Sequence, residues 1–253
     1  MCFEQHDRII SHFGHRMAIS PSIDPLGDSK SQVALIDSMG DSLSIVNDAR
    51  QSFGARSEQW SDKDAKLLSY LARNRHTSPF RGVVFKWQVK APLFVARQWY
   101  KHTIASTYVD DQLGWNEQSF RYCAADEAEF YIPMEFMQQS TSNRQASAGP
   151  LDTTNQLLAL VQYSQALEAC RQAYEGLLLT GVSKEQARAI LPSALYTSFV
   201  WTCSLQALFH FISLRIGHGA QGEITAYAKS LLELGHSVAP EAFDAFAENN
   251  YQF

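Results

Sequence analysis

Residues 82–102 read GVVFKWQVKAPLFVARQWYKH and carry the clearest secondary-structure signal in the chain. Between Gly82 and Pro92, apolar and polar side chains alternate, and the run is rich in Val, Phe and Trp. This alternation is typical of a half-buried strand, because successive side chains of a strand point to opposite faces of a sheet. Residues 93–102 have helical spacing, with Pro92 in the first turn. The stretch therefore predicts a strand that is followed at once by a helix.

Weaker signals of the same kind surround this unit in the N-terminal half. Residues 33–39 (VALIDSM) are a short apolar run before Gly40, which predicts a second strand. Ser61 or Asp62 is a suitable N-cap for a helix. The other elements expected here are helices within 42–53 and 61–76, a strand at 127–133 and a polar loop at 138–150.

The C-terminal half has helical patterns throughout. Residues 193–216 (SALYTSFVWTCSLQALFHFISLRI) are apolar on nearly every side, so we expect one buried helix there, in the core or at a subunit contact. The other helices are expected at 157–179, ending at Gly181, at 183–191, from a Ser cap to Pro192, and at 223–235. A few strands followed by many helices predict the α+β class rather than an alternating, doubly wound fold.

Composition limits the class of protein further. The 253 residues, 45% of them hydrophobic, suffice for one domain with elaborations or at most two small ones. No run approaches eighteen apolar residues and the N-terminus lacks the apolar core of a signal peptide, so we expect a cytoplasmic protein without a membrane span. The four cysteines are far apart, which argues against a zinc site or a disulfide framework.

Residues 1–32 differ in character from the rest of the chain. They combine histidines with a stretch rich in Pro, Ser, Gly and Asp, and we interpret them as an extension before a single domain at 33–253. His6, His12 and His15 could be metal ligands, but no acid or cysteine pattern accompanies them. We therefore assign no metal to the protein.

Charge is unevenly distributed along the sequence. The formal net charge is −5, which makes a general nucleic-acid-binding protein an unfavourable interpretation. The window from Arg73 to Ser106 nevertheless contains no carboxylate and seven basic residues, namely Arg73, Arg75, Arg81, Lys86, Lys90, Arg97 and Lys101. A basic island in an acidic chain predicts a small anionic ligand.

One short motif suggests a different function, the binding of a dinucleotide. Residues 217–222 match G-x-G-x-x-G and precede a helical pattern, as in dinucleotide-binding folds. Only 31 residues follow Gly222, too few for the further parallel strands of such a fold, and the residues before Gly217 continue a helical pattern. We therefore do not interpret this motif as a dinucleotide site.

Polar and cationic residues are concentrated at 97–106 and 116–122. Arg97 and Lys101 share a helical face, with Gln98 and His102 on the adjacent one. An extended chain at 116–122 would place three polar side chains on one side, those of Glu117, Ser119 and Arg121. Such cations, amides and hydroxyls suit a phosphate and a heteroaromatic ring. The alternative is a solvated basic helix beside a polar hairpin.

These motifs resemble those of the flavin-dependent thymidylate synthases, the ThyX family. The family signature is R-H-R, a short spacer and S-x-N-E-x-S-x-R-Y; here the matching residues are Lys101-His102-Thr103, Ser106 and 116–122. Blocks at 37–53, 76–99, 129–133, 181–192, 195–202 and 214–224 also look like family blocks in the family's order. The resemblance covers roughly residues 33–245.

The sequence departs from the family signature at two places. The R-H-R triplet is K-H-T, which loses one guanidinium at Thr103 and reduces another to a point charge at Lys101. About eight extra residues within 107–115, including Asp110 and Asp111, separate Ser106 from the second half of the motif. Both departures affect the expected contact with the flavin diphosphate more than the contact with the nucleotide.

The resemblance implies a fold, an assembly and a set of ligand contacts. The implied fold is a small, mostly antiparallel sheet with flanking long helices, assembled as a homotetramer whose sites lie at subunit interfaces. The implied dUMP contacts are Gln98, Lys101, Glu117, Gln118, Ser119, Phe120, Arg121, Arg188 and Arg215, with Arg215 also the catalytic residue. The implied FAD contacts are His76, Ser78, Lys101, His102, Thr103, Ser106, Asn116, Glu117, Ser204 and His210.

Three of these assignments have a simpler alternative, whereas Arg215 does not. His76 could bond its own loop, and His210 could be a satisfied core histidine. Arg188 could be a cation that interacts with a helix dipole. Arg215 ends an apolar helical pattern, where a cation needs an anionic or hydrogen-bonding partner.

The reaction implied is the reductive methylation of dUMP at C5. Methylenetetrahydrofolate supplies the carbon, NADPH or NADH reduces FAD, and Arg215 favours the N3 anion of uracil. Two alternatives remain: a C5-methylase of UMP or a related uridylate, and a non-catalytic nucleotide-binding homologue.

Overall fold

The computed structural model describes residues 21–104, 114–123, 129–144, 146–217 and 219–252. Its centre is a five-stranded sheet in the order β1-β2-β3-β7-β4, with every neighbouring pair antiparallel. The strands are β1 Ser22–Ile23, β2 Gln32–Met39, β3 Val84–Pro92, β4 Gly114–Glu117 and β7 Tyr196–Ser204. A separate pair joins β5 Met137–Gln139 to β6 Ser147–Pro150. The predicted α+β class and antiparallel sheet are confirmed.

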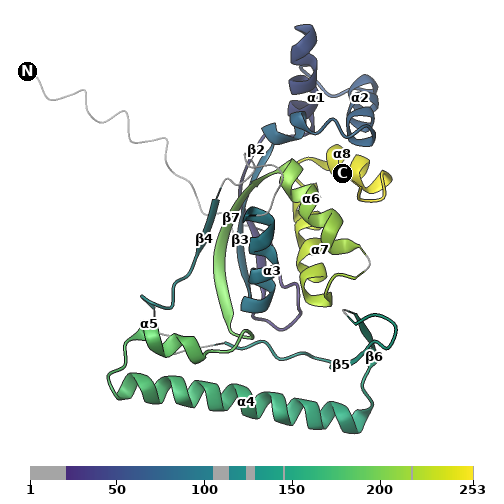
Figure 1. Ribbon diagram of the computed structural model, residues 1–253. Coiled ribbons are helices and arrows are strands. Elements are labelled where there is room, and N and C mark those ends of the chain that lie inside the picture. The colour runs from purple at the N-terminus through teal and green to yellow at the C-terminus, as the bar shows by residue number, and fades with distance from the viewer. Residues whose placement is uncertain (1–20, 105–113, 124–128, 145, 218, 253) are drawn as a thin grey trace, which may run out of the picture.

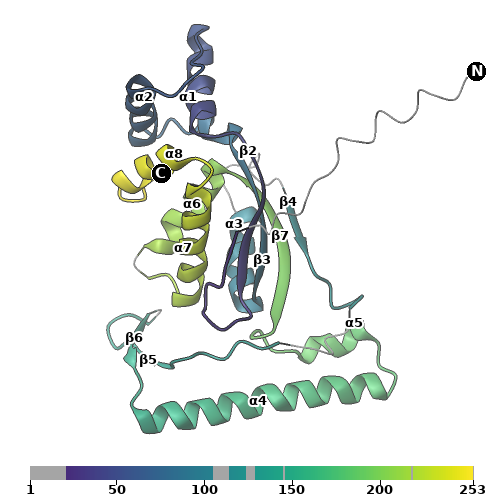
Figure 2. The same ribbon diagram turned by 180° about the vertical axis from the view of Figure 1, so that it is seen from behind.

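Helices lie on one face of this sheet and at both of its ends (Figures 1 and 2). α3 Leu93–Ile104, α6 Leu205–Ile216 and α7 Gly222–His236 are grouped on the face, while α4 Thr153–Leu179 extends across one end. The others are α1 Ser42–Arg50, η1 Gln51–Phe53, α2 Asp62–Arg73, η2 Ser78–Gly82, α5 Lys184–Ala187, η4 Arg188–Ile190 and α8 Pro240–Glu248. Among the residues described, no helix has the length and apolar character needed to cross a membrane.

The predicted strand and helix at 82–102 are β3 and α3. Phe85, Trp87 and Val89 alternate along β3 and are fully buried against the helices. From α3, the buried Trp99 stacks on Phe211 with ring centroids 4.6 Å apart and meets the edge of Trp201 at 5.4 Å. Each buried aromatic side chain of this size contributes about 2–3 kcal/mol from the removal of apolar surface from water. The core therefore holds α3 firmly against the sheet.

The prediction of one helix over 193–216 is wrong. Residues 196–204 form the strand β7, which pairs with β3 along its whole length, and only residues 205–216 form a helix, α6. β7 lies between β3 and β4, and its sequence, YTSFVWTCS, contains no charged residue and no regular exchange of apolar and polar side chains, so its alternation is weak. The change of conformation occurs at Ser204, whose Oγ accepts a hydrogen bond from the backbone N–H of Ala207 and caps α6.

Smaller predictions also need correction. In the strand expected at 127–133, only Phe130 forms a bridge, to Leu195, while residues 124–128 lie outside the described residues. The polar loop expected at 138–150 contains the β5–β6 pair, and the helix expected at 183–191 is the short α5 followed by η4. Within the predicted extension, β1 pairs with β2, so residues 22–23 belong to the sheet.

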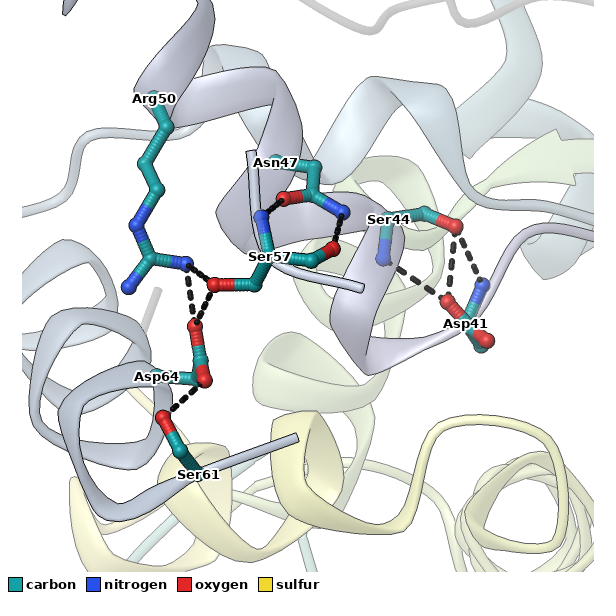
Figure 3. A network of polar contacts seen from close by, with 7 residues as sticks. All are labelled: Asp41, Ser44, Asn47, Arg50, Ser57, Ser61 and Asp64. Atoms are coloured by element: carbon teal, nitrogen blue, oxygen red, sulfur yellow. Dashed lines mark hydrogen bonds and ion pairs between the residues drawn. The ribbon is translucent and has the colours of Figure 1, made fainter. Parts of the chain in front are cut away.

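A polar network joins α1 to α2 (Figure 3). The buried carboxylate of Asp64 accepts hydrogen bonds from Ser57 and Ser61 and forms an ion pair with Arg50. Asn47 Oδ1 accepts a hydrogen bond from Ser57 N–H at 2.8 Å, and Asn47 Nδ2 donates one to the Ser57 carbonyl at 2.9 Å. Burial alone would raise the pKa of Asp64, but the hydrogen bonds from Ser61, Arg50 and Ser57 outweigh it and lower the pKa to about 2.

We expect Arg50→Ala to destabilise the protein by about 3 kcal/mol, because it leaves the Asp64 carboxylate buried without its cation. Urea unfolding at pH 7 measures the effect, and the exposed Arg56→Ala in the same segment is the control. Since the folded pKa of Asp64 is about 2 and its ordinary value is 3.8, this stabilisation is complete above pH 3.8 and is lost as pH falls toward 2. Equal unfolding midpoints for the two variants would contradict the prediction.

Candidate functional site

A cleft of about 520 Å³ lies where β4 ends, beside α5 and η4. Apolar side chains of Leu93, Phe120, Leu191 and Leu195 form part of its wall. Its polar lining residues are Glu117, Gln118, Ser119, Glu185 and Arg188, and Ala189 completes it. Apolar walls with a few convergent polar groups are typical of small-molecule sites. Five of the residues predicted to contact the nucleotide therefore line one cavity.

The backbone around β4 fixes the polar side of the cleft. Gln118 N–H donates to Ser198 O, which continues the pairing of β4 with β7 by one residue. The Glu117 carboxylate accepts from Thr197 Oγ1 at 2.9 Å and from Trp115 Nε1 at 3.2 Å, so both of its oxygens are positioned. The sheet thus presents Glu117 in a defined orientation.

The extended conformation predicted for 116–122 is wrong beyond Gln118. The backbone N–H groups of Tyr122 and Cys123 donate to Ser119 O, which makes a turn. Ser119 lines the cleft, whereas Arg121 is about half exposed and forms an ion pair with Glu185, Nη2 to Oε2 3.3 Å. Because of this turn, Arg121 lies at the edge of the cleft. A continued strand would instead have projected its side chain away from the sheet.

Arg188 belongs to the same cleft from the other side. It is the C-cap of α5 and the first residue of η4, and it is half-buried. α5 has only four residues, so the alternative of a cation that mainly stabilises a helix dipole has little support. Arg188 is thus available to an anion in the cleft.

A second group of predicted residues lies on α3 and α6. Arg215 Nε donates to His102 Nε2 at 3.0 Å, and the His102 ring lies 6.1 Å from that of His210. Burial lowers the pKa of His102 to about 4, and the positive charge of Arg215 and the neighbouring His210 add to the effect. Burial also lowers the pKa of Arg215. His102 is therefore neutral at pH 7 while Arg215 keeps its charge.

Two further residues of α3 belong to this second group. Gln98 Nε2 donates to Gln221 Oε1 at 2.7 Å, which connects α3 to the N-cap of α7. Lys101 is exposed in the last turn of α3. In the described residues, none of this group lines the cleft between β4 and η4.

The remaining predicted flavin contacts are dispersed. His76 and Ser78 are exposed before and in η2, and Tyr70 meets the His76 ring edge-on at 5.6 Å. Asn116 is exposed on β4, and Ser204 is the buried N-cap of α6 rather than a residue within a helix. The Thr103 side chain, Ser106 and the insertion as far as residue 113 lie outside the described residues.

Comparison with known proteins decides the family. The sequence matches the family described as thymidylate synthase complementing protein over residues 34–241. The chain belongs to this family. It is 45% identical over 220 residues to a flavin-dependent thymidylate synthase of Thermus thermophilus, covering 87% of this chain and 77% of that one. A flavin-dependent thymidylate synthase of Thermosipho africanus is 35% identical over 223 residues, with coverages of 88% and 93%.

The fold is also similar to that of a solved relative. The structure of a UMP/dUMP methylase from Streptomyces cacaoi bound with 5-Br dUMP matches with a TM-score of 0.74 and 28% identity. The match covers 85% of this chain and 94% of that one. The inferred family resemblance is confirmed, and the family match extends over residues 34–241 of the 33–245 expected.

The chemistry of the predicted flavin contacts on α3, on α6 and at η2 can be compared with the cofactor of flavin-dependent thymidylate synthases. Imidazole, ammonium and hydroxyl groups from His76, Ser78, Lys101, His102 and His210 are donors suited to a diphosphate and to the polar edge of a flavin ring. Ser204 fits less well, because its Oγ already caps α6. The types of donor in this set fit FAD.

Glu185 is a cleft residue that no sequence motif indicated. It lines the cleft and pairs with Arg121, and it stands three residues before Arg188, one helical turn away. In the sequence KEQAR (184–188), the three-residue spacing of Glu185 and Arg188 was the one indication that both side chains share a helical face.

Proposed function

We propose that this protein methylates dUMP to dTMP with FAD as cofactor, methylenetetrahydrofolate as carbon donor and NADPH or NADH as reductant. The observation that carries the proposal is the cleft in which Glu117, Gln118, Ser119 and Arg188 converge. A cation, a hydroxyl, an amide and a fixed carboxylate match the phosphate and the polar edges of a uridylate. Family membership supports the chemistry.

Each side of the cleft would hold a different part of the nucleotide. Arg188 and Arg121 would bind the phosphate, which requires Arg121 to exchange Glu185 for the ligand. Ser119 and Gln118 would donate hydrogen bonds, and Phe120 would pack on the ligand. Glu117 would hold its acceptor oxygens in place because Thr197 and Trp115 already bond them.

Arg215 is the proposed catalytic residue. Its guanidinium would stabilise the uracil ring with negative charge on N3, which makes C5 more nucleophilic without an enzyme nucleophile. FAD, held by His76, Ser78, Lys101, His102 and His210, would supply hydride chemistry when bound.

The assembly proposed is a homotetramer. α4 extends across one end of the molecule, and within it only Leu167 and Tyr174 are buried (Figure 1). Large apolar side chains exposed on it are Leu157, Leu158, Leu160, Val161 and Leu179. Such an exposed apolar helix favours contact with further copies of the chain. We propose that a neighbouring copy brings its α3 and α6 group to the cleft.

We expect light scattering to give about four times the 28.4 kDa chain mass. The double variant Leu157→Asp, Val161→Asp should reduce that mass, because two carboxylates would have to be buried in the contact. An unchanged mass in the double variant would place the contact elsewhere.

UMP is the second candidate substrate. The structural relative from Streptomyces cacaoi is a UMP/dUMP methylase and was also solved bound with 5-Br UMP, with a TM-score of 0.73. Turnover of dUMP and UMP by the purified protein compares the two candidates directly. If the protein turned over UMP much faster than dUMP, UMP would be assigned as the substrate in place of dUMP.

Complementation of a thymidine auxotroph tests substrate, cofactor and activity together. We expect growth without thymidine, and the purified protein should be yellow with an absorption band at about 450 nm from the bound flavin. A protein that stays colourless after addition of FAD would favour the third candidate, a non-catalytic homologue.

A further inference from the structure

Arg215 is held in place at both its backbone and its side chain. Thr225 Oγ1, on α7, donates to the Arg215 carbonyl at 2.7 Å. At the other end, Arg215 Nε donates to His102 Nε2 on α3 at 3.0 Å. Arg215, in the last turn of α6, is therefore bonded to α7 through its backbone carbonyl and to α3 through its guanidinium, which donates to His102.

The hydrogen bond fixes the protonation of His102. Nε2 can accept from a guanidinium only when it carries no proton, so the ring proton lies on Nδ1. Among the described residues, the charged and titratable groups that act on the ring are Arg215 and His210, which are both on α6 and both oppose a second proton. Trp99 lies on the same helix as His102, and its neighbours from the other elements are aromatic. Phe199 and Trp201 come from β7, and Tyr227 comes from α7.

The His102 ring itself has little freedom. Phe211 meets it edge-on, with centroids 4.9 Å apart, and Phe211 stacks in turn on the fully buried Trp99. Because Trp99 and His102 belong to the same helix, the imidazole is clamped between its own helix and α6. A clamped acceptor gives its donor a defined orientation.

We propose that His102 is a positioning residue for Arg215: as a neutral acceptor it occupies Nε and leaves the two terminal nitrogens of the guanidinium for the uracil. The proposal rests on the proposed function, since it assumes that Arg215 acts on a uridylate. It assigns His102 a role in addition to its expected contact with FAD. In that contact, only the protonated Nδ1 remains, and it can act only as a donor.

A neutral acceptor is the suitable partner for such a cation. A carboxylate in place of His102 would also bind Nε, but it would neutralise the charge that favours the uracil anion. A second cation would repel Arg215 and could not accept its proton. Imidazole with a low pKa orients the guanidinium and leaves its full charge for the ligand.

Two substitutions separate the acceptor from the bulk of the ring. His102→Gln keeps an amide oxygen that can reach the position of Nε2, whereas His102→Leu keeps volume but has no acceptor. His236→Leu is the matched control, since His236 is an exposed residue at the end of α7 paired with Asp244. Bound flavin, measured by absorbance, shows whether each variant retains the cofactor.

We expect His102→Leu to lower kcat for dUMP by about 10- to 100-fold with a much smaller change in KM. His102→Gln should recover most of that loss, and His236→Leu should equal the wild type. If the Leu and Gln variants lose kcat equally while the wild type is active, the role of His102 as an acceptor is refuted. An inactive wild type would instead refute the proposed function.

The tautomer of His102 provides a readout that does not depend on activity. Long-range proton–nitrogen NMR of histidine-labelled protein, with the signal assigned from His102→Gln, should show the proton on Nδ1 at pH 7. Arg215→Met should raise the pKa of His102 above about 4, because the charge of Arg215 contributes to lowering it. A proton on Nε2 in the wild type would overturn the proposal.

Discussion

Arg215→Ala is expected to reduce dTMP formation by at least about 10³-fold while FAD stays bound. The guanidinium is the proposed source of positive charge for the uracil anion, and burial makes that charge more effective than it would be in water. Truncation removes this charge, and His102, whose pKa is lowered mainly by burial, does not supply one in its place. Initial rates of dTMP formation at saturating dUMP measure the effect.

Two controls accompany this substitution. The flavin band should be unchanged, since the flavin contacts proposed on α3 and η2 remain, and an unchanged unfolding midpoint would show that α6 still packs. Arg215→Lys keeps a positive charge but loses the planar fork and the Nε–H that donates to His102, so its rate should lie between those of Ala and wild type. Wild-type turnover by Arg215→Ala would exclude the catalytic role.

The centre of the fold could be predicted because its signals are local. Lys86, Gln88 and Lys90 alternate with buried apolar residues on β3, so the period of two is visible in the sequence. β7 pairs with β3 in register over nine residues but gave the wrong prediction, since Val200 and the aromatic side chains around it hide the alternation. Its β-branched and aromatic residues were the remaining indication of a strand.

The candidate site was predictable only in part, for a related reason. The resemblance of the signature motif led to Glu117, Gln118, Ser119 and Arg188, which line one cleft. The hydrogen bond between His102 and Arg215 joins residues 113 positions apart, so neither periodicity nor spacing could indicate it. Packing of α3 against α6 creates that contact, and only the folded chain shows it.

Arg188→Ala is expected to weaken dUMP binding by about 2–4 kcal/mol, an increase in Kd of roughly 30- to 1,000-fold. Arg188 is half-buried in the cleft, where a bond to a phosphate is poorly screened by water. Arg121→Ala should cost less, because Arg121 is more exposed and must first leave Glu185. Calorimetric titration of dUMP into each variant compares the two arginines, and an unchanged Kd for Arg188→Ala would remove it from the site.

The same substitution decides whether two copies build one site. At a dUMP concentration far below the raised Kd of Arg188→Ala, chains with Arg188→Ala or Arg215→Ala should each be nearly inactive alone. If Arg188 comes from one chain and Arg215 from its neighbour, the two variants can together form a site with both arginines intact. Co-expression with two different affinity tags, followed by isolation of the mixed assembly, should then restore a measurable fraction of wild-type turnover. If both residues served the same site from within one chain, every site would lack one arginine and the mixture would stay inactive. Because Arg215 is bonded to His102 on α3 and Arg188 lines the cleft beside β4, we expect activity to return.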